Sequence, residues 1–311
     1  KDGHKYGIIY LPKFYINFDN RDDRDAAKDV TKEIDYLKKE GVSGIIMDVR
    51  DNGGGSLKTV VDIAGLFIEK GPIVQVKSSG KAKEVLSDTD STLQWDGPLV
   101  VLINNFSASA SEILAAAIQD YKRGIVLGSK HSFGKGTVQN VYPFNNFIRN
   151  SQFGDLGALK TTTQKFYRID GGSTQLKGVS SDVALPDRFS HIDFGERDTD
   201  NAMPWDKIDP ANYTPWKIAN YEQVILQSKK RISENAQFKL DDENAQWIKK
   251  RRDEYNYSLN LNQFKKEQDQ MTSETKRFNK ISDYKNNLIF KPISKEIPLM
   301  ENDTLFKEKR T

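Results

Sequence analysis

The sequence contains no cysteine among its 311 residues, and it contains only three histidines, at positions 4, 131 and 191. The absence of cysteine excludes disulfide bonds and cysteine-based catalysis. So few histidines also argue against a metal site built from several of them. No run of about 18 apolar residues occurs, and we therefore expect no transmembrane helix and no integral membrane segment.

A large excess of one charge is also missing. The 47 basic and 44 acidic residues give a net charge of +3, and this near balance demands neither a nucleic acid nor a membrane as partner. We therefore expect no nucleic-acid partner. The first residues, Lys1-Asp2-Gly3-His4, include neither an initiator methionine nor a signal peptide, which indicates a mature form or an excised fragment.

The composition changes along the chain. Most glycines and most β-branched apolar runs lie before about residue 190, whereas Lys, Glu, Asp, Asn and Gln dominate beyond about residue 215. This change predicts an α/β domain followed by a charged, mainly α-helical one. We place the two domains at residues 1–195 and 196–311.

Short apolar runs predict strands, and apolar residues at helical spacing predict helices. The expected strands are 6–11, 42–49, 72–76, 99–103, 125–127, 138–142 and 159–169, and the expected helices are 25–40, 57–69 and 110–121. The segment 178–186 closes the domain. A polar excursion, 77–96, follows the strand predicted at 72–76. Helix formers dominate from 221 to about 284, with candidate core positions at Val224, Ile225, Ile232, Phe238, Trp247 and Ile248.

A glycine-rich loop follows the strand predicted at 42–49. It contains Asn52-Gly53-Gly54-Gly55 and leads into the helix predicted at 57–69. Consecutive glycines allow positive φ angles and let the backbone approach a ligand closely, with its amide N–H groups exposed. This loop is therefore a candidate binding element.

A run of small hydroxyl residues, Ser107-Ala108-Ser109-Ala110-Ser111-Glu112, opens the helix predicted at 110–121. Ser109 followed three residues later by Glu112 is typical of a capping box, in which Glu112 reaches back to the amide of the capping residue. A serine hydroxyl at a helix N-terminus is also well placed for nucleophilic catalysis, because nearby N–H groups stabilise an oxyanion. The two interpretations are compatible. The Gly-x-Ser-x-Gly motif of α/β-hydrolases is absent.

Lys135 lies between two glycines after the strand predicted at 125–127. A phosphate-binding loop is ruled out because five residues separate Gly128 from Gly134 where that motif has four, and because Gly136 replaces the required Ser or Thr. Two alternatives remain, a surface lysine in a turn and a buried lysine. Only burial lowers a lysine pKa enough for it to act as a base near neutral pH. His131 is a rival base, but its place in the polar turn 129–132 favours an exposed loop histidine instead.

Three further side chains are candidates for support of this site. Asp120 can pair with Lys135 or Arg123, and Glu112 can orient the serine loop, although either carboxylate can equally lie on the surface. Gln139 either holds Lys135 by a hydrogen bond or simply begins a strand.

Taken together, these motifs resemble the tail-specific (carboxyl-terminal processing) serine proteases, and most closely the bacterial periplasmic type that carries a helical C-terminal domain. The resemblance rests on Asp48–Leu57, Phe106–Glu112, Gln119–Tyr121, Phe133–Gln139, Gln164–Arg168, Gly171–Gln175 and Asn201–Asp206. Because that type carries an additional helical C-terminal domain, the resemblance covers nearly the whole chain.

The resemblance implies a protease core similar to the ClpP/crotonase class and a Ser-Lys catalytic dyad. It implies that Ser109 is the nucleophile, that Lys135 is the general base and that Gln139 orients the lysine. It further implies an oxyanion hole formed by the amides of Ala110 and of one glycine of the loop, for which we choose Gly54.

The resemblance also implies proteins with accessible apolar C-terminal tails as substrates, an adaptor lipoprotein as a further partner, and the bacterial periplasm or cell envelope as location. It implies no cofactor and no metal. Asp120 matches a family position of less certain role. Lys135 follows Ser109 by 26 residues, one more than is usual, and the family's peptide-binding PDZ domain is missing from the sequence.

Two competing functions remain open. The chain can be a catalytically inactive module that binds peptide tails or acts as a scaffold, in which case Ser109 is only a helix cap. It can also be a crotonase-like acyl-thioester enzyme, which explains the glycine loop but not Lys135.

Overall fold

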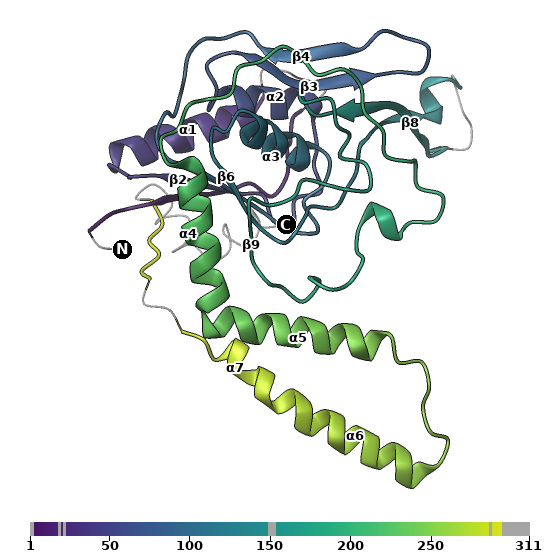
Figure 1. The fold of residues 1–311 in the computed structure, drawn as a ribbon. Coiled ribbons are helices and arrows are strands. Elements are labelled where there is room, and N and C mark those ends of the chain that lie inside the picture. The colour runs from purple at the N-terminus through teal and green to yellow at the C-terminus, as the bar shows by residue number, and fades with distance from the viewer. Residues whose placement is uncertain (1–2, 18–19, 21–22, 149–153, 286–287, 294–311) are drawn as a thin grey trace.

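The computed structural model describes residues 3–17, 20, 23–148, 154–285 and 288–293. These residues form an α/β core from which a group of helices projects (Figure 1). Part of the C-terminal domain predicted at 196–311 therefore lies outside the described residues, namely 286–287 and 294–311.

The first layer of the core is a parallel sheet of five strands in the order β1-β2-β5-β6-β9. The bounds are Gly7–Tyr10 for β1, Ile45–Asp48 for β2, Leu99–Ile103 for β5, Ile125–Gly128 for β6 and Val183–Ala184 for β9. The central strands are the continuous apolar runs of the sequence, as is typical of a parallel sheet with covered faces. Strands β1 and β2 are shorter than the predicted runs, β5 has the predicted bounds, and β6 is one residue longer. Of the segment 178–186 only β9 is a strand.

The second layer is an antiparallel sheet in the order β4-β3-β8-β7. The bounds are Gly71–Lys77 for β3, Glu84–Asp88 for β4, Thr137–Pro143 for β7 and Ala158–Tyr167 for β8. The polar stretch 77–96, to which no helix or strand was assigned, contains β4. Its polar residues are largely exposed, since β4 is an edge strand that pairs only with β3.

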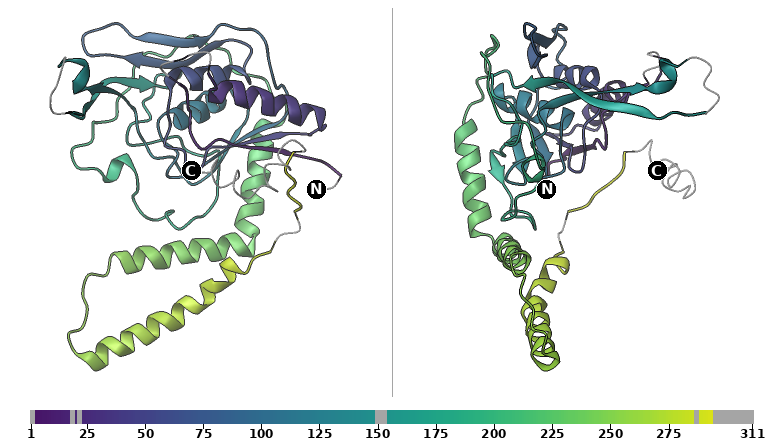
Figure 2. Two further views of the ribbon diagram at one scale, coloured as in Figure 1. Left: turned by 180° about the vertical axis from the view of Figure 1, so that it is seen from behind. Right: turned by 90° about the vertical axis from the view of Figure 1, so that its right-hand side faces the viewer.

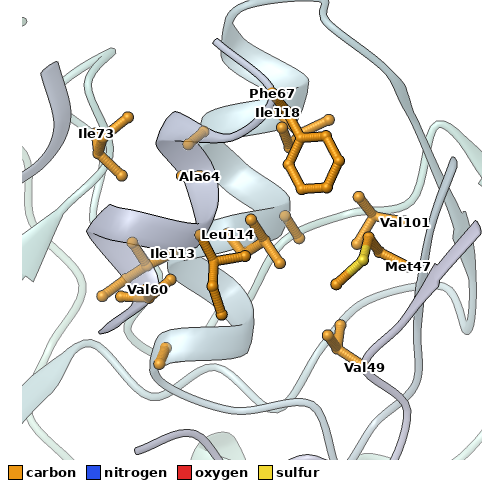
Figure 3. Close-up of a cluster of buried hydrophobic side chains, with 14 of the residues drawn as sticks. Met47, Val49, Val60, Ala64, Phe67, Ile73, Val101, Ile113, Leu114 and Ile118 are labelled. Atoms are coloured by element: carbon orange, nitrogen blue, oxygen red, sulfur yellow. The ribbon is translucent and has the colours of Figure 1, made fainter. Parts of the chain in front are cut away.

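Two helices, α2 (Leu57–Gly65) and α3 (Ala110–Asp120), pack against each other and contribute to the core together with both sheets. Figure 3 shows the cluster they form, with Val60, Ala64 and Phe67 meeting Ile113, Leu114 and Ile118 beside Met47, Val49 and Val101 of the parallel sheet. A third helix, α1 (Ala26–Lys39), is amphipathic and packs its buried face against β1 and α2. Residues Ala110–Ile118 of α3 are all buried in this core.

The C-terminal region contains α4 (Tyr221–Glu234), α5 (Ala236–Arg252), α6 (Leu261–Thr275) and the short α7 (Asn279–Ser282), and the described residues after β9 include no further strand. Figure 2 shows α4 against the core and α5 and α6 projecting away from it. Of the predicted core positions here, Ile225 is buried, but Val224 is 43% exposed and that prediction was wrong.

Helix α4 is attached through the hydroxyl of Tyr221, which donates to the carbonyl of Gly124 at 3.1 Å. Helix α5 is attached through Asp242, whose Oδ1 lies 2.8 Å from Nε2 of His191. None of the helices in the described part of the chain is long and apolar enough to cross a membrane.

Candidate active site

Ser109 lies where the loop after β5 turns into α3, and it is the N-cap residue of that helix. Its φ is +58°, an unfavourable value for a residue with a Cβ, which costs about 1–3 kcal/mol and persists only when neighbouring contacts enforce it. Those contacts come from the two residues that precede it. Ser107 Oγ donates to the Val49 carbonyl at 2.8 Å, and the Ala108 amide donates to the Asn52 carbonyl at 3.0 Å.

The glycine-rich loop packs closely against Ser109. A Cβ on Gly54 would lie 2.9 Å from the Ala108 carbonyl oxygen, 2.9 Å from Ser109 Cβ and 3.1 Å from the Ala110 amide nitrogen. Only a glycine fits here, and its φ of +106° makes the same demand. The backbone of Gly54 is therefore in van der Waals contact with the segment that carries Ser109.

The amide of Gly54 is already engaged, because it donates to Asn52 Oδ1 at 2.9 Å. Asn52 is fully buried and also donates to the Leu11 carbonyl at 2.8 Å, so its side chain is held firmly. If Gly54 serves in an oxyanion hole beside Ala110, its N–H must either donate to Asn52 and the oxyanion at once or give up its hydrogen bond to Asn52.

Lys135 belongs to the loop between β6 and β7, and it is half-buried. Its Nζ donates to Oε1 of Gln139 at 3.0 Å. Burial lowers the pKa of Lys135, and the positive charge of Lys160 lowers it further, against the opposing charges of Glu196 and Glu112. Within the described residues no hydrogen bond joins Lys135 Nζ to Ser109 Oγ.

The serine loop and the lysine loop meet at Glu112, a fully buried residue in the first turn of α3. The hydrogen bond that a capping box predicts is present, since the Ser109 amide donates to Glu112 Oε2 at 2.7 Å. The same carboxylate also accepts the amides of Gly134 and Lys135, at 2.7 and 3.0 Å. Ser132, which the sequence analysis did not single out, donates its hydroxyl to Oε1 at 2.6 Å.

His131 contacts Arg197 rather than Ser109. Its Nε2 lies 2.9 Å from Nη1 of Arg197, and because a guanidinium group only donates, this nitrogen must be the unprotonated one. Burial and the charge of Arg197 lower the pKa of His131. The ring is neutral, and the nitrogen that would accept a proton is already occupied by Arg197.

Asp120 pairs with neither of its predicted partners. Its side chain, only 7% exposed, lies at the end of α3 and forms an ion pair with Arg168, whose Nε lies 3.2 Å from Oδ2. Arg123 instead donates to the carbonyls of Phe67 and Trp95. The sequence motifs gave no signal for this pairing, because Arg168 follows β8 of the antiparallel sheet and lies 48 residues from Asp120 in the sequence. The alternative of a surface carboxylate was also wrong for Asp120.

Four aromatic rings lie beside the two loops. Phe106 contacts Phe189 and Phe194 edge to face, with ring centroids 5.5 and 4.7 Å apart, and Phe194 contacts Phe133 at 6.3 Å. Phe106 is 39% exposed, so this aromatic cluster offers an apolar surface next to the serine loop. Among the described residues, no group of three or more His, Cys, Asp or Glu side chains could hold a metal ion.

Comparison with known proteins gives two family matches. Residues 5–185 match Peptidase family S41, and residues 189–311 match the C-terminal domain of tail specific protease. The tail-specific protease of Haemophilus influenzae is 42% identical over 272 residues, which cover 86% of this chain and 38% of that protein. The chloroplastic C-terminal processing peptidase of Tetradesmus obliquus is 34% identical over 149 residues, covering 48% of this chain and 30% of that protein.

Among solved structures, the photosystem II D1 C-terminal processing protease is similar, with 30% sequence identity and a TM-score of 0.48. The match covers 58% of this chain and 42% of that one. The chain thus spans less than half the length of these relatives.

Proposed function

Because the chain belongs to the tail-specific, C-terminal processing protease family of S41 serine peptidases, we propose that it hydrolyses peptide bonds with a Ser109–Lys135 dyad. The observation that carries the proposal is the meeting of two loops at one buried carboxylate. Glu112 holds the amide of Ser109 and the amide of Lys135 at once, at 2.7 and 3.0 Å.

In the proposed reaction the neutral amine of Lys135 accepts the hydroxyl proton of Ser109 while Oγ forms a bond to the carbonyl carbon of the scissile peptide. Gln139 accepts one N–H of that amine, which directs its lone pair away from Gln139. The protonated lysine then returns the proton to the leaving amine as the C–N bond breaks. Lys135 then takes a proton from water, whose oxygen adds to the carbonyl carbon of the acyl-serine ester. The C–Oγ bond breaks, the protonated lysine returns the proton to Ser109 Oγ, and the acid product leaves.

The carbonyl oxygen becomes negatively charged when Ser109 adds to it. We assign the amides of Ala110 and Gly54 to this oxyanion. Support comes from the position of Ala110 at the first turn of α3, where free N–H groups and the helix dipole favour an anion. Close packing of Gly54 against Ser109 and Ala110 gives further support.

For substrates we propose proteins with accessible apolar C-terminal tails, and the aromatic cluster of Phe106, Phe133, Phe189 and Phe194 supports this because it presents apolar surface beside the serine loop. We further propose a catalytic domain at 1–195 and a helical domain at 196–311, the bacterial periplasm or cell envelope as location, and an adaptor lipoprotein as partner. The family resemblance supports these last proposals.

A fluorophosphonate probe that reacts with activated serines tests the mechanism. We expect the chain to be labelled at Ser109 and to cleave an unfolded protein, and we expect both activities to be lost in Lys135→Ala. His131→Ala is the matched variant in the same loop, and it should retain both. Labelling that survives in Lys135→Ala but disappears in His131→Ala would reject the dyad, and an inert Ser109 in the unmodified chain would favour the inactive tail-binding or scaffold function.

A further inference from the structure

Glu112 receives four hydrogen bonds from two loops that are more than twenty residues apart in the sequence. One donor is the amide of Ser109, and the other three belong to Ser132, Gly134 and Lys135. The carboxylate is fully buried, and so is Ser132. No other side chain in the described residues contacts the backbone amides of both Ser109 and Lys135.

All four partners donate to the carboxylate, and this arrangement suits only its ionised form. An ionised carboxylate has only acceptor sites, so it can take all four donors. A protonated carboxyl group carries a hydrogen of its own, which would face a donor. A glutamine in this position would direct an N–H group against the donors in the same way.

The charges around Glu112 are few. All four donors to its carboxylate are uncharged groups, namely three backbone amides and the Ser132 hydroxyl. The negative charge of Glu112 in turn tends to raise the pKa of Lys135. Burial raises the pKa of Glu112 to about 7, against the four hydrogen bonds that lower it. The ionised form is therefore lost as the pH falls through neutrality, and its contribution is present only above that range.

We infer that Glu112 is a positioning residue whose ionised carboxylate sets the Ser109 amide and the Lys135 amide in the geometry of the reaction. The inference rests on the proposed function. Glu112 touches no substrate, and it acts through the two loops. Two groups, Lys135 and Glu112, must then be unprotonated for the serine to react.

The number of groups that must lose a proton before Ser109 reacts can be measured. The rate of Ser109 labelling by the fluorophosphonate probe is followed from pH 5 to pH 9 in the full chain. When two groups must both lose a proton, the logarithm of the rate rises with a slope approaching 2 on the acid side, whereas a single group gives a slope of 1. We expect a slope approaching 2 in the unmodified chain and a slope of 1 in Glu112→Gln, with the plateau rate of that variant lower by about 10- to 100-fold.

Glu196→Gln is the matched control, because Glu196 also acts on the pKa of Lys135 but has no hydrogen bond to Glu112. Its acid limb should move to lower pH and keep the slope near 2. Ser132→Ala is the second test, since loss of one donor raises the pKa of Glu112. The pH at which the slope of the rate profile changes from 2 to 1 should therefore move upward. This variant keeps the carboxylate, so it tests the inference even if Glu112→Gln does not fold.

The failures are distinguishable. A slope of 1 in the unmodified chain, or a slope of 2 that persists in Glu112→Gln, overturns the role of Glu112 while labelling of Ser109 still supports the dyad. An unchanged profile in Ser132→Ala also overturns it. Absence of any labelling of the unmodified chain overturns the proposed function itself, and this inference with it. A lower melting temperature with an unchanged slope would assign Glu112 a structural role only.

Discussion

Gly54→Ala is a small change whose consequences follow from the packing of the glycine-rich loop. The new Cβ would lie 2.9 Å from the carbonyl oxygen of Ala108 and 2.9 Å from Ser109 Cβ, whereas ordinary contact begins at 3.4 Å. The atoms in the way belong to backbone or to a short side chain, so no flexible group can move aside. Relief requires the Ser109 segment or the loop to shift by about 0.5 Å.

Two costs to stability add up at this position. A residue with a Cβ at a positive φ costs about 1–2 kcal/mol, and overpacking by one methyl group costs about 1–3 kcal/mol. We therefore expect Gly54→Ala to lower the free energy of unfolding by about 2–5 kcal/mol. The effect on catalysis is separate, because the displaced atoms include the nucleophile. Since a misplacement of about 1 Å costs about 100-fold in rate, a shift of half that size is expected to cost about 10-fold.

The assay compares the rate of Ser109 labelling with the fraction of folded protein from thermal unfolding. Gly53→Ala is the matched control, because a Cβ there meets nothing within 4 Å and its φ is not positive. It should label at nearly the unmodified rate. Labelling of Gly54→Ala at the unmodified rate, or an equal loss of activity in Gly53→Ala, would refute this role of the packing at Gly54.

Two further predictions concern charges. Lys160→Glu replaces the positive charge that helps to lower the pKa of Lys135, so the acid limb of the rate profile should move to higher pH, most clearly at low salt because Lys160 is exposed; an unmoved limb at low salt would contradict this. Arg168→Met leaves the buried carboxylate of Asp120 unpaired and should destabilise the protein by about 3–5 kcal/mol at neutral pH. Burial already raises the pKa of Asp120, and loss of Arg168 raises it further. The deficit should therefore shrink as the pH falls and Asp120 becomes protonated, and urea unfolding at two pH values measures this.

The main elements of the core follow from local patterns. The apolar run at 99–103 and the amphipathic spacing at 25–40 predict β5 and α1, because burial of one stripe or of a whole strand leaves a periodic trace in the sequence. Strand β4 leaves no such trace. It lies at a sheet edge with polar, mostly exposed side chains, and only its pairing with β3 makes it a strand. Val224 was misplaced for a related reason, since helical spacing does not say which face of α4 meets the core.

In the candidate site, too, some contacts can be predicted from the sequence and others depend on the fold. Ser109 and its capping partner Glu112 are neighbours on one helical turn, so their hydrogen bond can be predicted from spacing alone. The link from Glu112 to Ser132 and Lys135 cannot, because it depends on how the loop after β6 folds back over α3. Asp120 shows the limit most clearly, since the sequence offered two nearby cations and the fold supplied Arg168 instead.

The sequence by itself determined the family of this protein, the α/β class of its core, and the residues proposed for its chemistry. These depend on residue types and short spacings, which a linear chain displays. Tertiary structure decided which charges are buried and which groups meet: the pairing of Asp120 with Arg168, the occupation of His131 by Arg197, and the four donors gathered on Glu112. A pKa depends on desolvation and on neighbours distant in the sequence, so only the folded chain can set one.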